Sequence, residues 1–153
     1  VLIPAWLACL YLINQPPGVW LIMFVVFLVA AADIGAYFSG KAFGRRKLAP
    51  NVSPGKSWEG VIGGALFAML LAAAFNVIFG WQSWLSLLAI VLPTALISVV
   101  GDLLESMVKR HRGVKDSSQL VPGHGGVLDR IDGLVAAAPI FALGLMSTQW
   151  QLV

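Results

Sequence analysis

Long apolar stretches alternate with two polar windows along this chain. Residues 1–32, 60–101 and 133–153 contain no Asp, Glu, Lys or Arg, so all 10 basic and 7 acidic residues lie between them. A helix that crosses a bilayer needs about 20 consecutive, mostly apolar residues. The pattern therefore predicts an all-α, polytopic membrane protein with one transmembrane domain over residues 1–153. Five helical segments are expected, at 1–13, 19–38, 58–79, 84–101 and about 127–147.

The polar stretches 39–57 and 102–126 are expected on one side of the membrane, because two spans separate them. They hold nine of the ten Lys and Arg residues, whereas the connections on the opposite side, 14–18 and 80–84, hold none. Loops that face the cytoplasm are enriched in Lys and Arg. The two polar stretches are therefore predicted to face the cytoplasm, in a bacterial inner membrane.

Composition excludes several other classes of protein. The chain is 59% hydrophobic and only 11% charged, whereas soluble domains carry about a quarter charged residues. This rules out a soluble globule, a disordered chain and a nucleic-acid-binding module with a basic face. The net charge of +3 is explained by membrane topology and by attraction to anionic lipid. The chain starts inside an apolar stretch without an initiator Met, so we expect it to be the C-terminal part of a longer protein.

The acidic residues indicate where a functional site lies. All seven fall in two segments, 33–60 and 102–132, which we expect to form the site. An ionised carboxylate near hydrocarbon is costly and marks a site or a paired network, although a salt bridge at the interface is the alternative. Four of the acids lie where apolar sequence begins, namely Asp33, Asp102, Asp129 and Asp132.

The spacing of these acids favours a site for a metal ion and phosphate. Asp102, Glu105 and Lys109 share one face of a helix, and Asp129 and Asp132 share a face of another. Mg²⁺ takes hard oxygen ligands, usually one or two carboxylates together with phosphate and water. Nearby Lys and Arg side chains balance the remaining phosphate charge. The expected cofactor is Mg²⁺, with a second cation left open.

Two glycine-rich stretches need separate interpretations. Residues 50–57 end like a phosphate-binding P-loop, but the first glycine of that motif is replaced by Pro50 and no buried strand precedes it. We expect a turn into the next helix, with Ser57 as its cap and Lys56 able to contact phosphate. Residues 122–126 precede a helix N-terminus, which favours anion binding. His124 within it is a candidate phosphate donor, an acid–base group, or a residue that only orders the turn.

The charged and glycine positions from Ser106 to Asp132 closely resemble the signature of the phosphatidate cytidylyltransferase family over 27 consecutive residues. That family makes CDP-diacylglycerol from CTP and phosphatidic acid. Further blocks that look like the family lie upstream. They are Asp33-Ile34-Gly35-Ala36-Tyr37, Gly40-Lys41-Ala42-Phe43-Gly44, Ser53-Pro54-Gly55-Lys56-Ser57 and Gly101-Asp102-Leu103-Leu104-Glu105-Ser106.

The resemblance implies a magnesium-dependent, all-α membrane enzyme that transfers a cytidylyl group from CTP to phosphatidic acid, within the bilayer and as a homodimer. Asp102 and Asp129 are the implied metal ligands, and Asp33 is added as a further candidate. Residues assigned to the catalytic set are Ser106, Lys109, Arg110, Lys115, Asp116, His124, Arg130 and Asp132. The basic residues among them are expected to hold the phosphates, Ser106 and His124 to donate hydrogen bonds, and Asp116 and Asp132 to be secondary candidates for the metal. Residues assigned to binding the nucleotide are Lys56, Ser57, Gly125 and Gly126.

Three other readings of the sequence remain open at this point. A CTP-dependent kinase of polyprenol or phytol alcohols shares the nucleotide chemistry but needs a base that activates a hydroxyl. An ion-coupled transporter usually carries its charges near the bilayer midplane, whereas these acids gather at one interface beside basic residues. A non-catalytic assembly fragment is the third reading.

Overall fold

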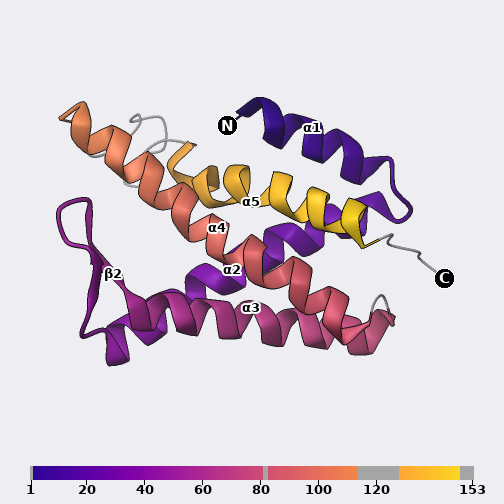
Figure 1. Cartoon of the computed structure of the whole chain (residues 1–153), viewed down its shortest axis with the longest axis horizontal. Coiled ribbons are helices and arrows are strands. Elements are labelled where there is room, and N and C mark those ends of the chain that lie inside the picture. The colour runs from indigo at the N-terminus through magenta and orange to yellow at the C-terminus, as the bar shows by residue number, and fades with distance from the viewer. Residues whose placement is uncertain (1, 81–82, 114–127, 149–153) are drawn as a thin grey trace.

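The computed structural model describes residues 2–80, 83–113 and 128–148, with the side chains of 128–130 excepted. Five helices and one short hairpin make up these residues (Figure 1). The helices are α1 (Leu2–Ile13), α2 (Gly18–Phe43), α3 (Trp58–Phe79), α4 (Trp84–His111) and α5 (Leu128–Ser147), and the strands are β1 (Lys47–Ala49) and β2 (Ser53–Ser57). The prediction of five helical segments is confirmed.

Three of these helices, α2, α3 and α4, are long and apolar enough to cross a membrane. Helix α1 and the apolar part of α5, Ile131–Ser147, are shorter. Large apolar side chains remain on the outside of the bundle, such as Leu70 with 67% of its surface exposed and Leu85 with 79%. Such exposed leucines are favourable when lipid surrounds the bundle, in agreement with the membrane protein that the sequence predicts.

Two of the helices continue past the apolar stretches that predicted them. Residues 39–43 belong to α2, although they were expected in a polar loop. Residues 102–111 belong to α4, as the helical spacing of Asp102, Glu105 and Lys109 indicates. At 1.5 Å per residue, the 28 residues of α4 span about 42 Å, which exceeds the ~30 Å of a hydrocarbon core. Hydropathy marks where the membrane ends, whereas the helix ends only where its backbone hydrogen bonds stop. The charged residues 102–111 therefore project from the bundle on a helix.

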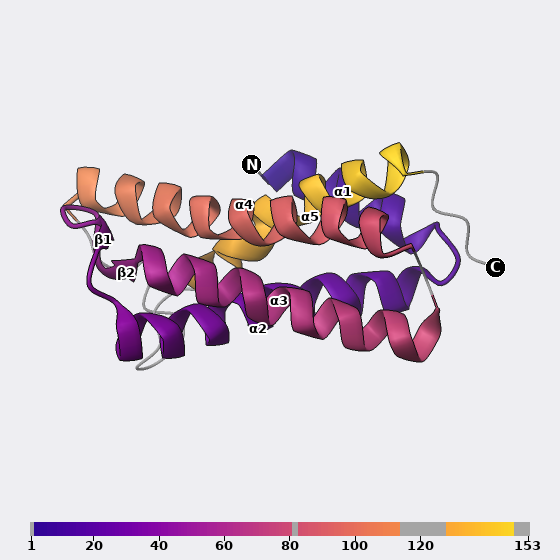
Figure 2. The same cartoon turned by 60° about the horizontal axis from the view of Figure 1, so that its bottom comes forward.

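The charged ends of the helices lie together. Figures 1 and 2 both place the end of α2, the hairpin and the C-terminal end of α4 at one end of the bundle. The connection at residues 14–17, the end of α3 and the start of α4 lie at the opposite end. This agrees with the predicted sidedness of the polar stretches, while residues 114–127 lie outside the described part.

The core is apolar and is centred on α2. Leu21, Phe24 and Leu28 are fully buried there. The ring centroid of Phe24 lies 5.2 Å from that of Phe75 in α3 and 5.7 Å from that of Phe141 in α5. These aromatic contacts tie α2 to α3 and α5.

Glycines bring the backbones of α2 and α3 into contact. A Cβ on Gly64 would lie 2.6 Å from the Ala32 carbonyl oxygen, and one on Gly60 would lie 2.9 Å from that of Ala36. Small residues spaced four apart allow membrane helices to approach this closely. The Gly60–Gly64 pair therefore allows α3 to approach α2 closely.

The hairpin that joins α2 to α3 was not predicted. β1 and β2 pair antiparallel with an irregular register, and Arg46 fastens the hairpin to α3. The Arg46 backbone N–H donates to the Glu59 carboxylate at 3.2 and 3.3 Å, and the Trp58 N–H donates to the Arg46 carbonyl at 3.0 Å. The predicted cap is confirmed, because Ser57 Oγ accepts from the Gly60 N–H at 3.1 Å.

We expect Gly64→Leu to destabilise the bundle because the new side chain collides with the α2 backbone. Overpacking of this kind costs about 1–3 kcal/mol, so the midpoint of thermal unfolding in detergent should fall clearly. The matched control is Ala74→Leu on the exposed side of the same helix, which should leave the midpoint nearly unchanged. Equal midpoints for the two variants would contradict the close packing of α2 on α3.

Candidate functional site

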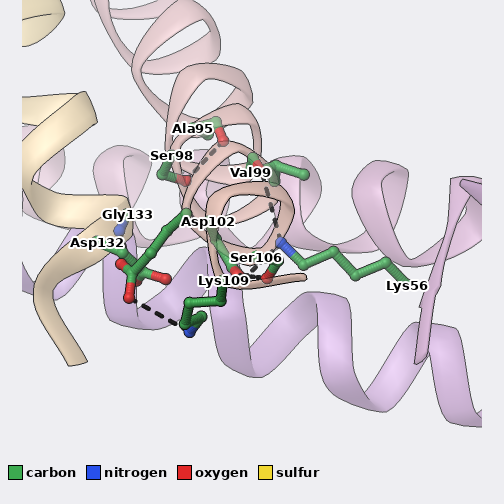
Figure 3. Close-up of polar contacts among 10 residues, drawn as sticks. Lys56, Ala95, Ser98, Val99, Asp102, Ser106, Lys109, Asp132 and Gly133 are labelled. Atoms are coloured by element: carbon green, nitrogen blue, oxygen red, sulfur yellow. Dashed lines mark hydrogen bonds and ion pairs between the residues drawn. The ribbon is translucent and has the colours of Figure 1, made fainter. Parts of the chain in front are cut away.

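Lys56 joins the hairpin to the projecting part of α4. Its ammonium forms an ion pair with Asp102 Oδ2 and donates to the Val99 carbonyl at 3.4 Å (Figure 3). The two charged side chains are 23% and 36% exposed, so water screens part of their attraction. The contact therefore serves to orient the two side chains more than to stabilise the fold.

Both oxygens of the Asp102 carboxylate have a partner. Lys56 pairs with Oδ2, and Ser106 Oγ, one turn further along α4, donates to Oδ1 at 3.3 Å. Because Asp102 and Ser106 share one helix, their relative position is set by the backbone. The carboxylate is thus held in one orientation, facing the hairpin.

A cavity of about 390 Å³ opens between α2, β2, α3 and α4. It is lined by Asp33, Ala36, Tyr37, Ser53, Gly55, Lys56, Ser57, Gly60, Val61, Val99 and Asp102. Cavities of roughly 300–1,000 Å³ with a few polar groups are the usual small-molecule sites. Two carboxylates and one ammonium therefore share a space large enough for part of a nucleotide.

The helix packing explains how these groups meet. Asp33 lies on α2 between the glycine contacts that press α2 against α3. The cap at Ser57 fixes where α3 begins and so where the neighbouring Lys56 leaves the hairpin. The Asp33 carboxylate interacts electrostatically with Asp102, Lys56 and Asp132. Charged side chains from α2, β2, α4 and α5 thus interact with one another.

A second charged group lies on another face of α4. Lys109 Nζ lies 3.3 Å from Glu105 Oε1, and the two side chains are only 17% and 13% exposed. Asp132 of α5 accepts from the Gly133 N–H at 2.7 Å and interacts electrostatically with Asp102 and Lys109. Figure 3 shows Asp132 and Lys56 on opposite sides of α4.

This second group borders a largely apolar pocket of about 240 Å³. The pocket is lined by Leu2, Gly101, Leu104, Glu105, Val108, Asp132, Val135 and Ala136. The pocket therefore combines two carboxylates with apolar side chains, and it lies beside the polar cavity that Lys56 lines.

The structure brings together part of the predicted site. Asp33, Lys56, Ser57 and Asp102 line the polar cavity, and Ser106 contacts Asp102. Lys109 and Asp132 belong to the neighbouring group. Arg110 is exposed on the last turn of α4 and lines neither cavity. Predicted residues outside the described part are Lys115, Asp116, His124, Gly125 and Gly126, together with the side chains of Asp129 and Arg130.

The described residues include carboxylates that could serve as the protein ligands of a magnesium ion. Among them, no group of three Asp, Glu, His or Cys side chains is placed to hold one metal ion. Asp33 and Asp102 nevertheless offer hard oxygens in the same cavity, and Mg²⁺ commonly uses one or two carboxylates while phosphate and water complete its shell. The donor set thus suits a metal ion that arrives with phosphate.

Sequence reasoning missed three contributors to the site. Tyr37 lines the cavity one turn after Asp33, and that four-residue spacing was a usable signal. The Glu105–Lys109 pair has the same spacing, but no role was assigned to Glu105. Nothing in the sequence indicates that the Val99 carbonyl is part of the site, because it accepts from Lys56 only as a result of the fold.

Comparisons with known proteins identify the family of this chain. A profile of the cytidylyltransferase family matches residues 1–148. A phosphatidate cytidylyltransferase of Haemophilus influenzae is 59% identical over 130 residues, which cover 82% of this chain and 45% of the relative. One of Pseudomonas aeruginosa is 56% identical over 153 residues, covering 98% of this chain and 56% of the relative. The chain thus spans about half the length of the curated relatives it matches.

A solved structure has a similar fold. It is described as an insight into an intramembrane enzyme for archaeal membrane lipids biosynthesis, and it superposes with a TM-score of 0.54 at 22% identity. The match covers 78% of this chain and 77% of that one. The helical arrangement is therefore shared with a membrane enzyme, and the profile match and the close relatives show that this chain belongs to the cytidylyltransferase family.

Proposed function

We propose that this chain carries the nucleotide site of an enzyme that transfers a cytidylyl group from CTP to phosphatidic acid. The observation that carries the proposal is the polar cavity in which Lys56, Asp33 and Asp102 face one another at the charged end of a membrane bundle. The relatives named phosphatidate cytidylyltransferase support it. A lipid acceptor and a water-soluble nucleotide meet most readily at such a boundary.

The reaction requires the enzyme to position its two substrates more than to activate a nucleophile. A phosphate oxygen of phosphatidic acid attacks the α-phosphorus of CTP, a new P–O bond forms, and the bond to the departing pyrophosphate breaks. The nucleophile is already an anion, so no Ser or Cys has to be activated. Holding two anions together and stabilising the charge on the pyrophosphate are the main tasks.

The polar residues of the site have different roles in this scheme. Lys56 neutralises Asp102 in the structure and turns toward the triphosphate when CTP enters. Asp33 and Asp102, together with Asp129, are the proposed ligands of Mg²⁺, which would offset the negative charge of the phosphates. Ser106 orients Asp102 by its hydrogen bond. Lys109, close to the apolar pocket, is placed to attract the phosphate of the lipid.

The side of the membrane and the oligomeric state belong to this proposal as well. CTP is a cytoplasmic metabolite, so the charged end of the bundle is proposed to face the cytoplasm of a bacterial inner membrane. The basic residues at that end support the orientation. The homodimer expected from the family resemblance stays a prediction.

We expect Asp33→Asn and Asp102→Asn each to lower kcat/KM by about 10²-fold or more, because each removes charge stabilisation from the reacting phosphates. The assay is CTP-dependent pyrophosphate release by the full-length protein in vesicles with phosphatidic acid. Raising the Mg²⁺ concentration should recover part of the rate. Glu59→Gln is the control, since Glu59 lines neither cavity and the amide keeps an acceptor for Arg46. Wild-type rates in both Asn variants at limiting Mg²⁺ would falsify the metal assignment.

Replacing the Lys56 ammonium tests its role toward phosphate. Lys56→Met keeps the length of the side chain and removes its charge, so KM for CTP should rise at least ~10-fold, as expected for loss of a charge-assisted hydrogen bond. Lys56→Arg should keep KM much closer to the wild-type value. A lower thermal midpoint with an unchanged KM would instead mean that Lys56 only holds the hairpin in place.

Single cysteines test the orientation in the membrane. In a Cys9→Ser background, Asn51→Cys places a thiol in the exposed turn of the hairpin and Ser83→Cys places one at the opposite end of the bundle. A membrane-impermeant maleimide should label position 51 only in inside-out vesicles and position 83 only in intact spheroplasts. The reverse pattern would show that the cavity opens away from the cytoplasm.

A further inference from the structure

The charged end of the bundle carries several exposed cations and aromatic rings, at the end of α2, in the hairpin and at the start of α3. We call this surface the basic–aromatic patch. It consists of Tyr37, Phe38, Lys41, Phe43, Arg45, Arg46, Lys47 and Trp58, all exposed. Among the aromatic members, Phe43 is 71% exposed and Tyr37 is 62% exposed. Apart from Tyr37, none of these residues lines the polar cavity.

Among the described residues, the cations of the patch outnumber the acids beside them. Within the described residues, the ion pairs are Lys56–Asp102 and Lys109–Glu105, and neither includes a member of the patch. Glu59 is the acid next to the hairpin, and its carboxylate accepts from the backbone N–H of Arg46. Four cations against one carboxylate leave a clear excess of positive charge.

The position of the patch along the helices matches the boundary of a bilayer. The apolar stretch of α2 ends near residue 38, and the helix then continues through Lys41 to Phe43. Helix α3 begins at Trp58 at the same end of the bundle (Figure 2). Aromatic rings gather at the level of the headgroups, and basic residues just beyond an apolar helix are attracted to anionic lipid.

One contact joins the patch to the polar cavity. Lys41 Nζ lies 5.8 Å from the centroid of the Tyr37 ring, within the range of a cation–π interaction. Tyr37 also lines the cavity. Whatever the patch binds therefore lies beside the cavity rim.

We propose that the basic–aromatic patch binds the headgroups of anionic bilayer phospholipids that are not substrates. The four cations pair with the headgroup phosphates, while the exposed rings lie among the glycerol and upper acyl carbons. Charge complementarity favours this occupant, and apart from Tyr37 the patch shares no residue with the lining of the polar cavity. The proposal thus goes beyond the transfer reaction and can fail independently of it.

The test measures which lipids surround the protein. The protein is reconstituted in phosphatidylcholine vesicles without phosphatidic acid, and electron paramagnetic resonance gives the association constant of spin-labelled phosphatidylglycerol relative to spin-labelled phosphatidylcholine. We expect a preference for phosphatidylglycerol of at least ~3-fold at low salt that weakens in 0.5 M salt, as for electrostatic attraction of several basic residues.

Two variants with substitutions at the same four positions distinguish an effect of charge on lipid preference from an effect of altered structure. The neutral variant is K41Q/R45Q/R46Q/K47Q, and the matched control K41R/R45K/R46K/K47R keeps every charge. The hydrogen bonds of Arg46 in the hairpin use its backbone, so both variants should keep the wild-type thermal midpoint. The neutral variant should lose the preference and the control should keep it.

Three outcomes would overturn the proposal. They are an unchanged preference in the neutral variant, an equal loss in both variants, and a preference abolished by saturating CTP with Mg²⁺, which would place the patch in the nucleotide site. Because no turnover is measured, an inactive protein that still prefers phosphatidylglycerol would count against the transferase proposal only.

Discussion

The close approach of α2 and α3 is the constraint on which the rest of the structure depends. At Gly60 and Gly64 there is no room for a side chain between the two helices, because the carbonyls of Ala32 and Ala36 occupy it. In a bilayer, where lipid is as apolar as leucine, such contact is a main source of helix association. It fixes Asp33 on one wall of the cavity and the first turn of α3 on another.

The hairpin and the projecting end of α4 use that fixed geometry. Ser57 caps α3, so the neighbouring Lys56 starts from a defined point and reaches Asp102 and the Val99 carbonyl. A carboxylate at a membrane boundary is costly unless it is paired, and Lys56 supplies that pairing. In the proposed reaction the same ammonium turns from Asp102 to the triphosphate of CTP, and Mg²⁺ held by the carboxylates would offset most of the negative charge that remains.

Much of this architecture could be predicted from the distribution of charge. The hydrocarbon core excludes ionised groups, so the uncharged stretches mark the five helices and the polar windows mark one end of the bundle. Where α2 ends could not be predicted in the same way, because residues 39–43 continue the helix outside the hydrocarbon. The extension of α4 through residues 102–111 is indicated by the helical spacing of its charged residues and not by hydropathy. The hairpin was missed because its strands are only three and five residues long and pair with an irregular register, so they leave little alternation in the sequence.

The sequence predicts which residues form the candidate site better than it predicts which of their side chains contact one another. The spacing of Asp102 and Ser106 along one helix predicts that they share a face, and they are hydrogen-bonded. The pairing of Lys56 with Asp102 joins elements 46 residues apart in sequence and follows only from the fold. Residues 114–127, which carry the glycine-rich stretch with His124, lie outside the described part, so their predicted roles stay predictions.

The central claim is that Asp33, Lys56 and Asp102 together receive the phosphates of a cytidine nucleotide. A structure of the full-length protein with CTP and Mn²⁺, which replaces Mg²⁺ and gives an anomalous signal, tests it most directly. The account predicts a metal peak in contact with the Asp33 or Asp102 carboxylate and Lys56 Nζ within hydrogen-bonding distance of the triphosphate. A metal and triphosphate bound elsewhere, with the Lys56–Asp102 pair intact, would contradict it.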